Sequence, residues 1–362
     1  MIMLTGDVML GRGMDQILRH SVDPVIHEPY MHSATGYVEL AEEKNGPIPR
    51  KAAPDYVWGD ALALLSRLDP RVRIVNLETA VTTSNRPWPG KGIQYRMHPA
   101  NVDVLAAARI DCASLANNHV LDWSRDGLLE TLDSLHKAGV KTAGAGVNLA
   151  QAAAPAIFEV PGGRVLLFAM ADESSGVPPS WAAQVDRAGV RLLPDLSRKI
   201  TLQIAREIKA QRKAGDRAIV SIHWGGNWGY AVSDEQERFA KTLIDAGAAD
   251  VVHGHSSHHP KRIELYRGRP IIYGAGDLIN DYEGIGGYEE FRPDLSLIYL
   301  PALGTSGELE SMLLLPMRME RFRLNRASAE ERDWLLRLLE KQSRGFRFEI
   351  TPDGLIAARP QR

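Results

Sequence analysis

The chain has 362 residues, of which 44% are hydrophobic and 24% are charged, and its formal net charge is -2. This composition is typical of a globular protein and gives no sign of a basic surface for nucleic acid or an anionic membrane, so we expect neither partner. The single cysteine, Cys112, excludes a disulfide framework, and no apolar run approaches the length of a membrane span. The N-terminus lacks the basic and apolar regions of a signal peptide, so we expect a cytoplasmic protein.

The first half of the chain alternates short apolar runs, which predict strands, with helical spacing of apolar residues. We predict strands at 2–4, 73–77, 112–116, 140–143, 157–160 and 165–169, and helices at 56–68, 99–108 and 128–135. Three segments read as irregular, at 21–51, 82–98 and 172–195. The first is rich in proline, tyrosine and histidine, which favours an insertion that covers a substrate over a plain linker.

The second half continues the alternation and then changes. We predict helices at 196–213 and 234–246, strands at 217–223, 251–252 and 270–274, antiparallel strands at 295–300, 309–315 and 317–324, a helix at 330–342 and a short tail. The pattern predicts an α/β protein. We expect residues 1–290 to form one domain, which the strands and helix of residues 291–362 complete.

Four histidines lie within seven residues directly after the apolar run 251–252: His253, His255, His258 and His259. A strand that ends in a tight turn can direct several imidazole rings at one point, and neutral histidine is a common metal ligand. This clustering favours a metal site over a polar loop with incidental histidines.

Other predicted strands also end in polar residues. These residues are Asp7, Glu78, Asn118, His119 and His223. An oxygen and nitrogen donor set suits one divalent ion, or a pair bridged by a carboxylate, such as zinc, manganese or iron. The sequence offers no set of thiolates, which excludes a cysteine-based structural zinc site. A hydrolytic metal site is therefore one expectation from the residues alone.

Taken together, these motifs resemble the CapA (poly-γ-glutamate capsule synthesis) family. The matching motifs are Gly6-Asp7, Asn76-Leu77-Glu78, Ser114 to His119, His223-Trp224-Gly225, Gly254 to His258 and Tyr273 to Asp277. The resemblance covers residues 2–285 and implies the calcineurin-like metallophosphoesterase fold, a central β-sandwich flanked by helices. It also implies an acid/base role for His119 and a set of metal ligands: Asp7, Glu78, Asn118, His223, His255 and His258.

The chain departs from the phosphoesterase pattern at three places. Met9 stands where a histidine is expected, Asn76-Leu77-Glu78 replaces a Gly-Asp pair, and two residues rather than one separate His255 from His258. These departures argue for one weakly held metal and against ordinary phosphoesterase activity.

The resemblance extends to a metal-dependent epimerase of lasso-peptide biosynthesis. It implies inversion of the Cα centre of a peptide's C-terminal residue by metal-assisted proton transfer. Candidates for the acid/base pair are His119, His253, His259, Asp277 and Asp281. Candidates for binding a peptide or small-molecule substrate are Arg86, Lys91 and Arg96 for a carboxylate, and Trp224 and Trp228 for a bulky side chain.

Two alternatives stay open beside epimerisation. One is hydrolysis of a phosphoester or an amide by a metal-dependent enzyme. The other is a non-catalytic accessory of poly-γ-glutamate capsule biosynthesis. The sequence does not decide the oligomeric state.

Overall fold

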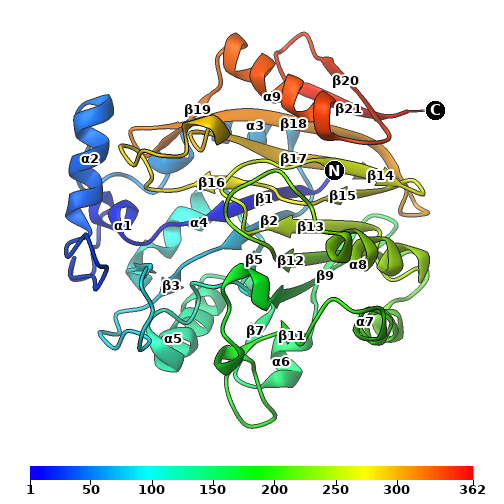
Figure 1. Cartoon of the computed structure of the whole chain (residues 1–362), viewed down its shortest axis with the longest axis horizontal. Helices are drawn as coiled ribbons and strands as arrows, with labels where there is room; N and C mark the ends of the chain where they lie inside the picture. The colour runs from blue at the N-terminus through cyan, green and yellow to red at the C-terminus, as the bar shows by residue number, and fades with distance from the viewer. Residues whose placement is uncertain (362) are drawn as a thin grey trace.

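The structure is a computed structural model that describes residues 1–361, and its centre is a pair of β-sheets (Figure 1). Within that range, the first sheet has ten strands. Eight follow the spatial order β20 (Phe346–Ile350), β21 (Ile356–Pro360), β18 (Leu309–Glu320), β17 (Leu295–Leu303), β1 (Met3–Val8), β2 (Arg73–Leu77), β5 (Cys112–Ser114) and β6 (Lys141–Ala143). The other two pair on the side, β16 (Asp277–Ile279) with β1 and β19 (Arg323–Arg326) with β18.

The second sheet has seven strands over the same described residues. Six follow the order β11 (Leu192–Leu193), β9 (Gly163–Asp172), β12 (Arg217–His223), β13 (Val251–His255), β15 (Arg269–Ile272) and β14 (Ile263–Tyr266), and β8 (Ala156–Val160) pairs with β9. Two short pairs lie outside both sheets, β3 (Ala80–Val81) with β4 (Arg96–Met97) and β7 (Ala145–Gly146) with β10 (Gly189–Val190).

Helices lie on the outer faces of the two sheets and at one end of them (Figure 1). They are α1 (Gly13–Ile17), α2 (Thr35–Asn45), α3 (Ala61–Leu68), α4 (Asp103–Ala107), α5 (Ser124–Lys137), α6 (Leu149–Ala153), α7 (Arg198–Gln211), α8 (Asp234–Asp245) and α9 (Ala329–Gln342). Short 3₁₀ turns occupy Tyr56–Trp58, Pro99–Val102, Glu173–Ser175, Pro179–Trp181 and Glu289–Phe291. Among the described residues, no helix has the length and apolar character needed to cross a membrane.

The central strands are apolar on both faces because both faces are covered. Successive side chains of a strand point to opposite sides. In β12, Ile219 faces the layer between the sheets, whereas Val220 packs under α7 and α8. In β2, Ile74 enters the same inner layer, and Val75 packs under α3, α4 and α5. Strands buried on both faces therefore read as continuous apolar runs rather than alternating ones.

The parallel strands bring their carboxyl ends to one side of the molecule. β1, β2 and β5 are parallel in the first sheet, and β9, β12 and β13 are parallel in the second. Figure 1 shows α1 and α2 at the end of the sheets toward which β1 runs. Polar residues at these strand ends consequently face one shared region, the usual place for a site in α/β proteins.

The predicted α/β architecture, a central β-sandwich flanked by helices, is confirmed. Five details of the prediction were wrong. Segment 82–98 contains the short strand β4. Segment 21–51 contains helix α2, and segment 172–195 contains two short strands, β10 and β11. Met317 does not begin a new strand, because β18 continues to Glu320 and turns at Arg321-Phe322, where both φ angles are positive. The predicted tail after 342 instead forms β20 and β21 of the first sheet.

Candidate metal centre

All six predicted metal ligands lie together at the carboxyl ends of the parallel strands. Asp7 belongs to β1, His223 ends β12 and His255 ends β13, with His223 and His255 opposite each other in register. Glu78 follows β2 directly, and Asn118 lies in the loop after β5. His258 lies three residues beyond the end of β13. Strand pairing within each sheet and the packing of the two sheets together bring close ligands that are far apart in the sequence.

Two groups of side chains have the geometry to hold a metal ion, and Asp7 belongs to both. Asp7, His223 and His255 each offer one ligand atom, and these atoms lie within 4.8 Å of one another. Asp7, His258 and Asp277 meet the same criterion. We call these the first and the second cluster. In the first, Nδ1 of His223 lies 2.7 Å from Nδ1 of His255. In the second, Nδ1 of His258 lies 2.9 Å from Oδ1 of Asp277.

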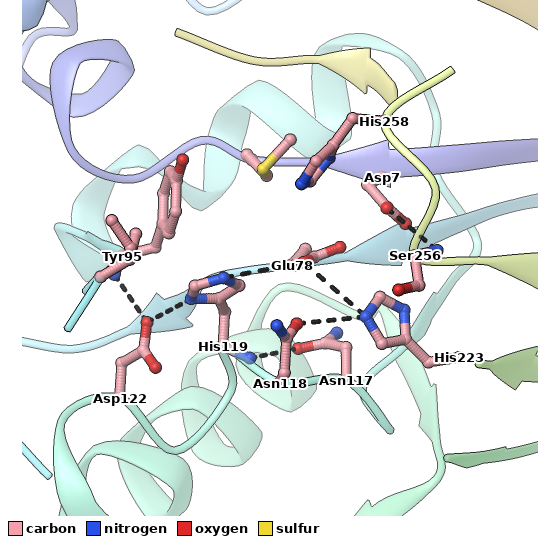
Figure 2. Close-up of polar contacts among 12 residues, drawn as sticks. Asp7, Glu78, Tyr95, Asn117, Asn118, His119, Asp122, His223, Ser256 and His258 are labelled. Atoms are coloured by element: carbon pink, nitrogen blue, oxygen red, sulfur yellow. Dashed lines mark hydrogen bonds and ion pairs between the residues drawn. The ribbon is translucent and has the colours of Figure 1, made fainter. Parts of the chain in front are cut away.

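Glu78 and Asn118 border the first cluster (Figure 2). Oε1 of Glu78 lies 3.8 Å from Nε2 of His223, and Oδ1 of Asn118 lies 3.1 Å from the same nitrogen. The amide of Asn76 donates to Oδ1 of Asp7 at 2.7 Å and to Oε2 of Glu78 at 3.2 Å. This shared donor fixes the two carboxyl groups side by side.

The electrostatics of the clusters fit a divalent cation. Burial, together with the nearby Asp277 carboxylate, raises the pKa of Asp7 to about 7. Burial and the neighbouring Asp7 also raise the pKa of Glu78 well above its ordinary value. Crowded acidic groups out of contact with water are costly unless a cation is near them.

The imidazoles are in the form that binds metal. Burial, and secondarily the repulsion between neighbouring rings, lowers the pKa values of His223 and His255 well below the ordinary value, so both rings are neutral at pH 7. Nε2 of His255 lies 2.9 Å from Oγ of Ser221, which orients the ring and leaves Nδ1 facing His223. Neutral imidazole and carboxylate donors fit zinc, manganese or iron.

His119 lies beside the clusters and is oriented by an aspartate that the sequence analysis missed. Nδ1 of His119 is 2.6 Å from Oδ2 of Asp122, and the backbone N–H of Tyr95 donates to the same oxygen at 2.7 Å (Figure 2). With Nδ1 engaged by Asp122, Nε2 points toward Glu78, 3.8 Å from its Oε1. Burial lowers the pKa of His119 to about 4, opposed by Asp122, so the neutral ring can accept a proton at Nε2.

The other predicted acid/base groups have varied surroundings. Asp277 pairs with His258 in the second cluster. His253 is fully buried behind His255, with Nδ1 3.2 Å from Oγ of Ser221. His259 stacks on Phe291. Asp281 accepts from the guanidinium of Arg12, which engages both of its oxygens.

A pocket of about 560 Å³ opens above the clusters. Two of the five predicted substrate-binding residues, Lys91 and Trp228, line it. Its wall also includes His119, His258, Asn118, Arg12, Tyr30, Tyr282 and Tyr288. Tyr30 belongs to the segment that we predicted to cover the substrate, and Tyr288 stacks on Trp228 with the ring centroids 3.9 Å apart.

Three predicted substrate-binding residues lie elsewhere in the described part of the chain. Arg86 is exposed and forms an ion pair with Asp126 on the surface. Arg96 lies over the ring of Trp123, 3.8 Å from its centroid. Trp224 is buried under α8, where it donates through Nε1 to the carbonyl oxygen of Tyr273 at 2.9 Å. These side chains lie on the surface or in the core and not in the pocket. The aromatic and basic residues of a loop therefore do not by themselves identify the residues that line a pocket.

Comparison with known proteins supports the resemblance found in the motifs. The family model for the bacterial capsule synthesis protein PGA_cap matches residues 1–282. The chain belongs to this family. A relative from Mycobacterium tuberculosis, named probable polyglutamine synthesis accessory protein, is 48% identical over 364 residues, covering 99% of this chain and 96% of that protein. The Bacillus subtilis PGA biosynthesis protein CapA is 29% identical over 277 residues, covering 76% of this chain and 62% of CapA.

A solved structure is similar to this chain. It is the 5'-nucleotidase precursor of Thermus thermophilus, which aligns with a TM-score of 0.42 and 16% identity over 80% of this chain and 53% of that chain.

Proposed function

We propose that this PGA_cap protein is a metal-dependent hydrolase that acts on the amide bonds of a glutamyl or glutaminyl polymer. The observation that carries the proposal is the pair of clusters sharing Asp7, placed under a pocket beside the oriented His119. The names of the relatives refer to polyglutamine synthesis and PGA biosynthesis. These names are the reason for proposing a glutamyl or glutaminyl polymer as the substrate.

The side chains divide the chemistry among them. A divalent ion held by the two clusters would lower the pKa of a coordinated water and polarise a substrate carbonyl. His119 accepts the proton of the attacking water at Nε2 and delivers it to the amide nitrogen as the C–N bond breaks. Asp122 keeps the ring in the required tautomer, as the 2.6 Å contact at Nδ1 indicates. The products are a carboxylate and an amine, and no further reactant is needed.

The test is cleavage of short glutamate and glutamine peptides. We would incubate the protein, reconstituted with manganese or zinc, with α-linked and γ-linked trimers in deuterated water and follow the products by mass spectrometry. We expect metal-dependent cleavage, and we expect His119→Gln to lose cleavage while it keeps its metal. Metal binding without cleavage of any trimer would contradict the proposal and favour the non-catalytic accessory.

The same experiment addresses epimerisation. Deuterium at a Cα centre without a change in chain length would support epimerisation of the trimer. Epimerisation of a lasso-peptide precursor stays a prediction, and the names of the relatives support the alternative of an accessory in poly-γ-glutamate capsule biosynthesis better. The cytoplasmic location and the lack of membrane and nucleic-acid partners also stay predictions.

A further inference from the structure

The wall of the pocket carries positive but not negative side chains. Arg12 and Lys91 line it, and of the described residues that form the wall none is aspartate or glutamate. The nearby acidic groups Asp7, Glu78 and Asp277 lie in the clusters below, and each is at most 3% exposed. A ligand in the pocket therefore meets cations along the wall.

The guanidinium of Arg12 already forms hydrogen bonds with other residues of the protein. Its Nε donates to Oδ2 of Asp281 at 2.8 Å, its Nη2 to Oδ1 of the same residue at 2.5 Å, and its Nη1 to Oε1 of Glu28 at 3.2 Å. The guanidinium also lies over the ring of Tyr37, 3.6 Å from its centroid, and its side chain is only 2% exposed. Two carboxylates thus offset the charge of Arg12.

Lys91 is paired with one carboxylate, whereas Arg12 is paired with two. Its Nζ lies 3.1 Å from Oδ1 of Asp122 and 3.4 Å from the carbonyl oxygen of Ile93. The contact with Asp122 is an ion pair and not a hydrogen bond, because Oδ1 of Asp122 has no hydrogen-bond partner. An ammonium group has three donors, and the carbonyl oxygen of Ile93 accepts one of them, so donors remain for a ligand. Nδ1 of His119, 3.4 Å away, does not accept a further donor when that nitrogen donates to Asp122.

We propose that Lys91 determines specificity by binding a free carboxylate of the polymer, and that the site therefore selects acidic glutamyl units over neutral glutaminyl units. Lys91 and His119 contact different oxygens of the same Asp122 carboxylate. A carboxylate bound at Lys91 consequently lies next to the group that transfers the proton.

The proposal rests on the proposed function and narrows its substrate. The names of two relatives differ on this point, because one refers to polyglutamine and the other to PGA. A lysine attracts a carboxylate by charge as well as by a hydrogen bond, whereas a carboxamide offers a neutral oxygen. The ammonium next to His119 favours the acidic polymer.

The test compares the binding of two probes by isothermal titration calorimetry. The probes are a γ-linked glutamate trimer and the same trimer with its free carboxylates converted to primary amides. The manganese-reconstituted protein is compared with Lys91→Met and Lys91→Arg. Lys137→Met serves as the matched control, because Lys137 lies on the exposed face of α5.

We expect the wild type to bind the acidic trimer at least about tenfold more tightly than the amide trimer. Lys91→Met should reduce this ratio to about one, Lys91→Arg should keep most of it, and Lys137→Met should leave it unchanged. An unchanged ratio in Lys91→Met overturns the proposal, as does a wild type that binds neither trimer or prefers the amide.

This experiment separates the two proposals because it measures binding rather than turnover. If the wild type binds the acidic trimer through Lys91 but cleaves no trimer, the hydrolase proposal fails and the specificity proposal stands. If the wild type cleaves trimers and Lys91→Met keeps the preference, the hydrolase proposal stands and the specificity proposal fails.

Discussion

Asp7 is the residue on which both clusters depend. The amide of Asn76 and the backbone N–H of Ser256 donate to its two oxygens, at 2.7 and 3.3 Å. Each oxygen therefore has a fixed position, and one faces the first cluster, 3.9 Å from Nδ1 of His255. A change at Asp7 is expected to affect both clusters, whereas a change at His255 affects one.

Asp122 offers a test of the acid/base assignment. Asp122→Asn replaces the oxygen pair that contacts His119 and Lys91 with an amide, which can hold the imidazole in the wrong tautomer. Because Asp122 is not a member of either cluster, we expect turnover to fall about a hundredfold or more with unchanged metal content. The measurement pairs trimer cleavage with metal analysis. Unchanged turnover would remove His119 from the proposed mechanism.

Lys261 gives a pH-dependent prediction at a residue that is not a proposed metal ligand. Its Nζ donates to the carbonyl oxygen of Ala231 at 3.0 Å, and burial lowers its pKa from 10.5 to about 8. The unfolded chain holds this proton more tightly. The stability contribution of the neutral lysine is therefore complete above pH 10.5 and is lost as the pH falls through 8.

Lys261→Met removes this titration. Relative to the variant, the wild type should gain up to about 3 kcal/mol of unfolding free energy between about pH 7 and pH 10.5. Urea titrations of both proteins across this range measure the difference. If the difference in unfolding free energy between the two proteins does not change with pH, the folded protein does not shift the pKa of Lys261.

At the scale of secondary structure, two strands approach each other closely. Their approach brings together the first and the last of the site motifs along the chain, Gly6-Asp7 and Tyr273 to Asp277. β1 and β16 are parallel, with Asp7 opposite Asp277. A Cβ atom at Gly6 would lie 1.6 Å from the carbonyl oxygen of Gly276. Only glycine allows this approach, which places the two carboxyl groups of the second cluster together.

Gly6→Ala should therefore force β1 and the segment before β16 apart. We expect a loss of about 3 kcal/mol in unfolding free energy, together with weaker metal binding. Gly226→Ala is the control, because a Cβ there has open space, and it should change stability by less than about 0.5 kcal/mol. Thermal unfolding with metal analysis measures both. Equal stability of the two variants would contradict the stated cause.

The strand ends of the site were predictable, and several outer elements were not. Apolar runs followed by a polar residue identified β1, β2, β12 and β13, because strands covered on both faces leave a strong signal. Helix α2 was missed because its sequence, Thr35–Asn45, buries only Tyr37, Val38 and Ala41. β20 was missed because charged residues alternate along a partly exposed edge strand.

Within the site, the sequence indicated the residues that follow strands but not their partners. Asp122 lies in a turn three residues after His119, and nothing in its local pattern distinguishes it from a surface aspartate. Arg12 lies between two glycines, and its contact with Asp281 spans 269 positions. Contacts of this kind depend on the tertiary fold, which the local sequence does not encode.

At the scale of the whole molecule, the C-terminal segment tests the expected domain organisation. β21 pairs with β18, and Phe346 and Ile356 are buried in the layer that also holds Leu4 of β1. That residues 291–362 complete a single domain stays a prediction. A chain ending at residue 343 loses β20 and β21 and should unfold at least about 5 °C lower.

Calorimetry of the shortened chain measures this effect. Ile350→Ser in the full chain is the control, because Ile350 is 41% exposed on the same hairpin and its loss should change the unfolding temperature little. A shortened chain that unfolds at the temperature of the full chain would show that the two segments are independent.

The central claim is that the two clusters hold divalent metal, and metal analysis by mass spectrometry tests it most directly. The wild type, Asp7→Asn, His255→Ala and the exposed control Asp133→Asn would be reconstituted with manganese or zinc and desalted. We predict one or two ions per chain in the wild type and control, a partial loss in His255→Ala and a near-complete loss in folded Asp7→Asn, because Asp7 belongs to both clusters. A metal-free wild type, or an Asp7→Asn protein with the wild-type metal content, would contradict the account.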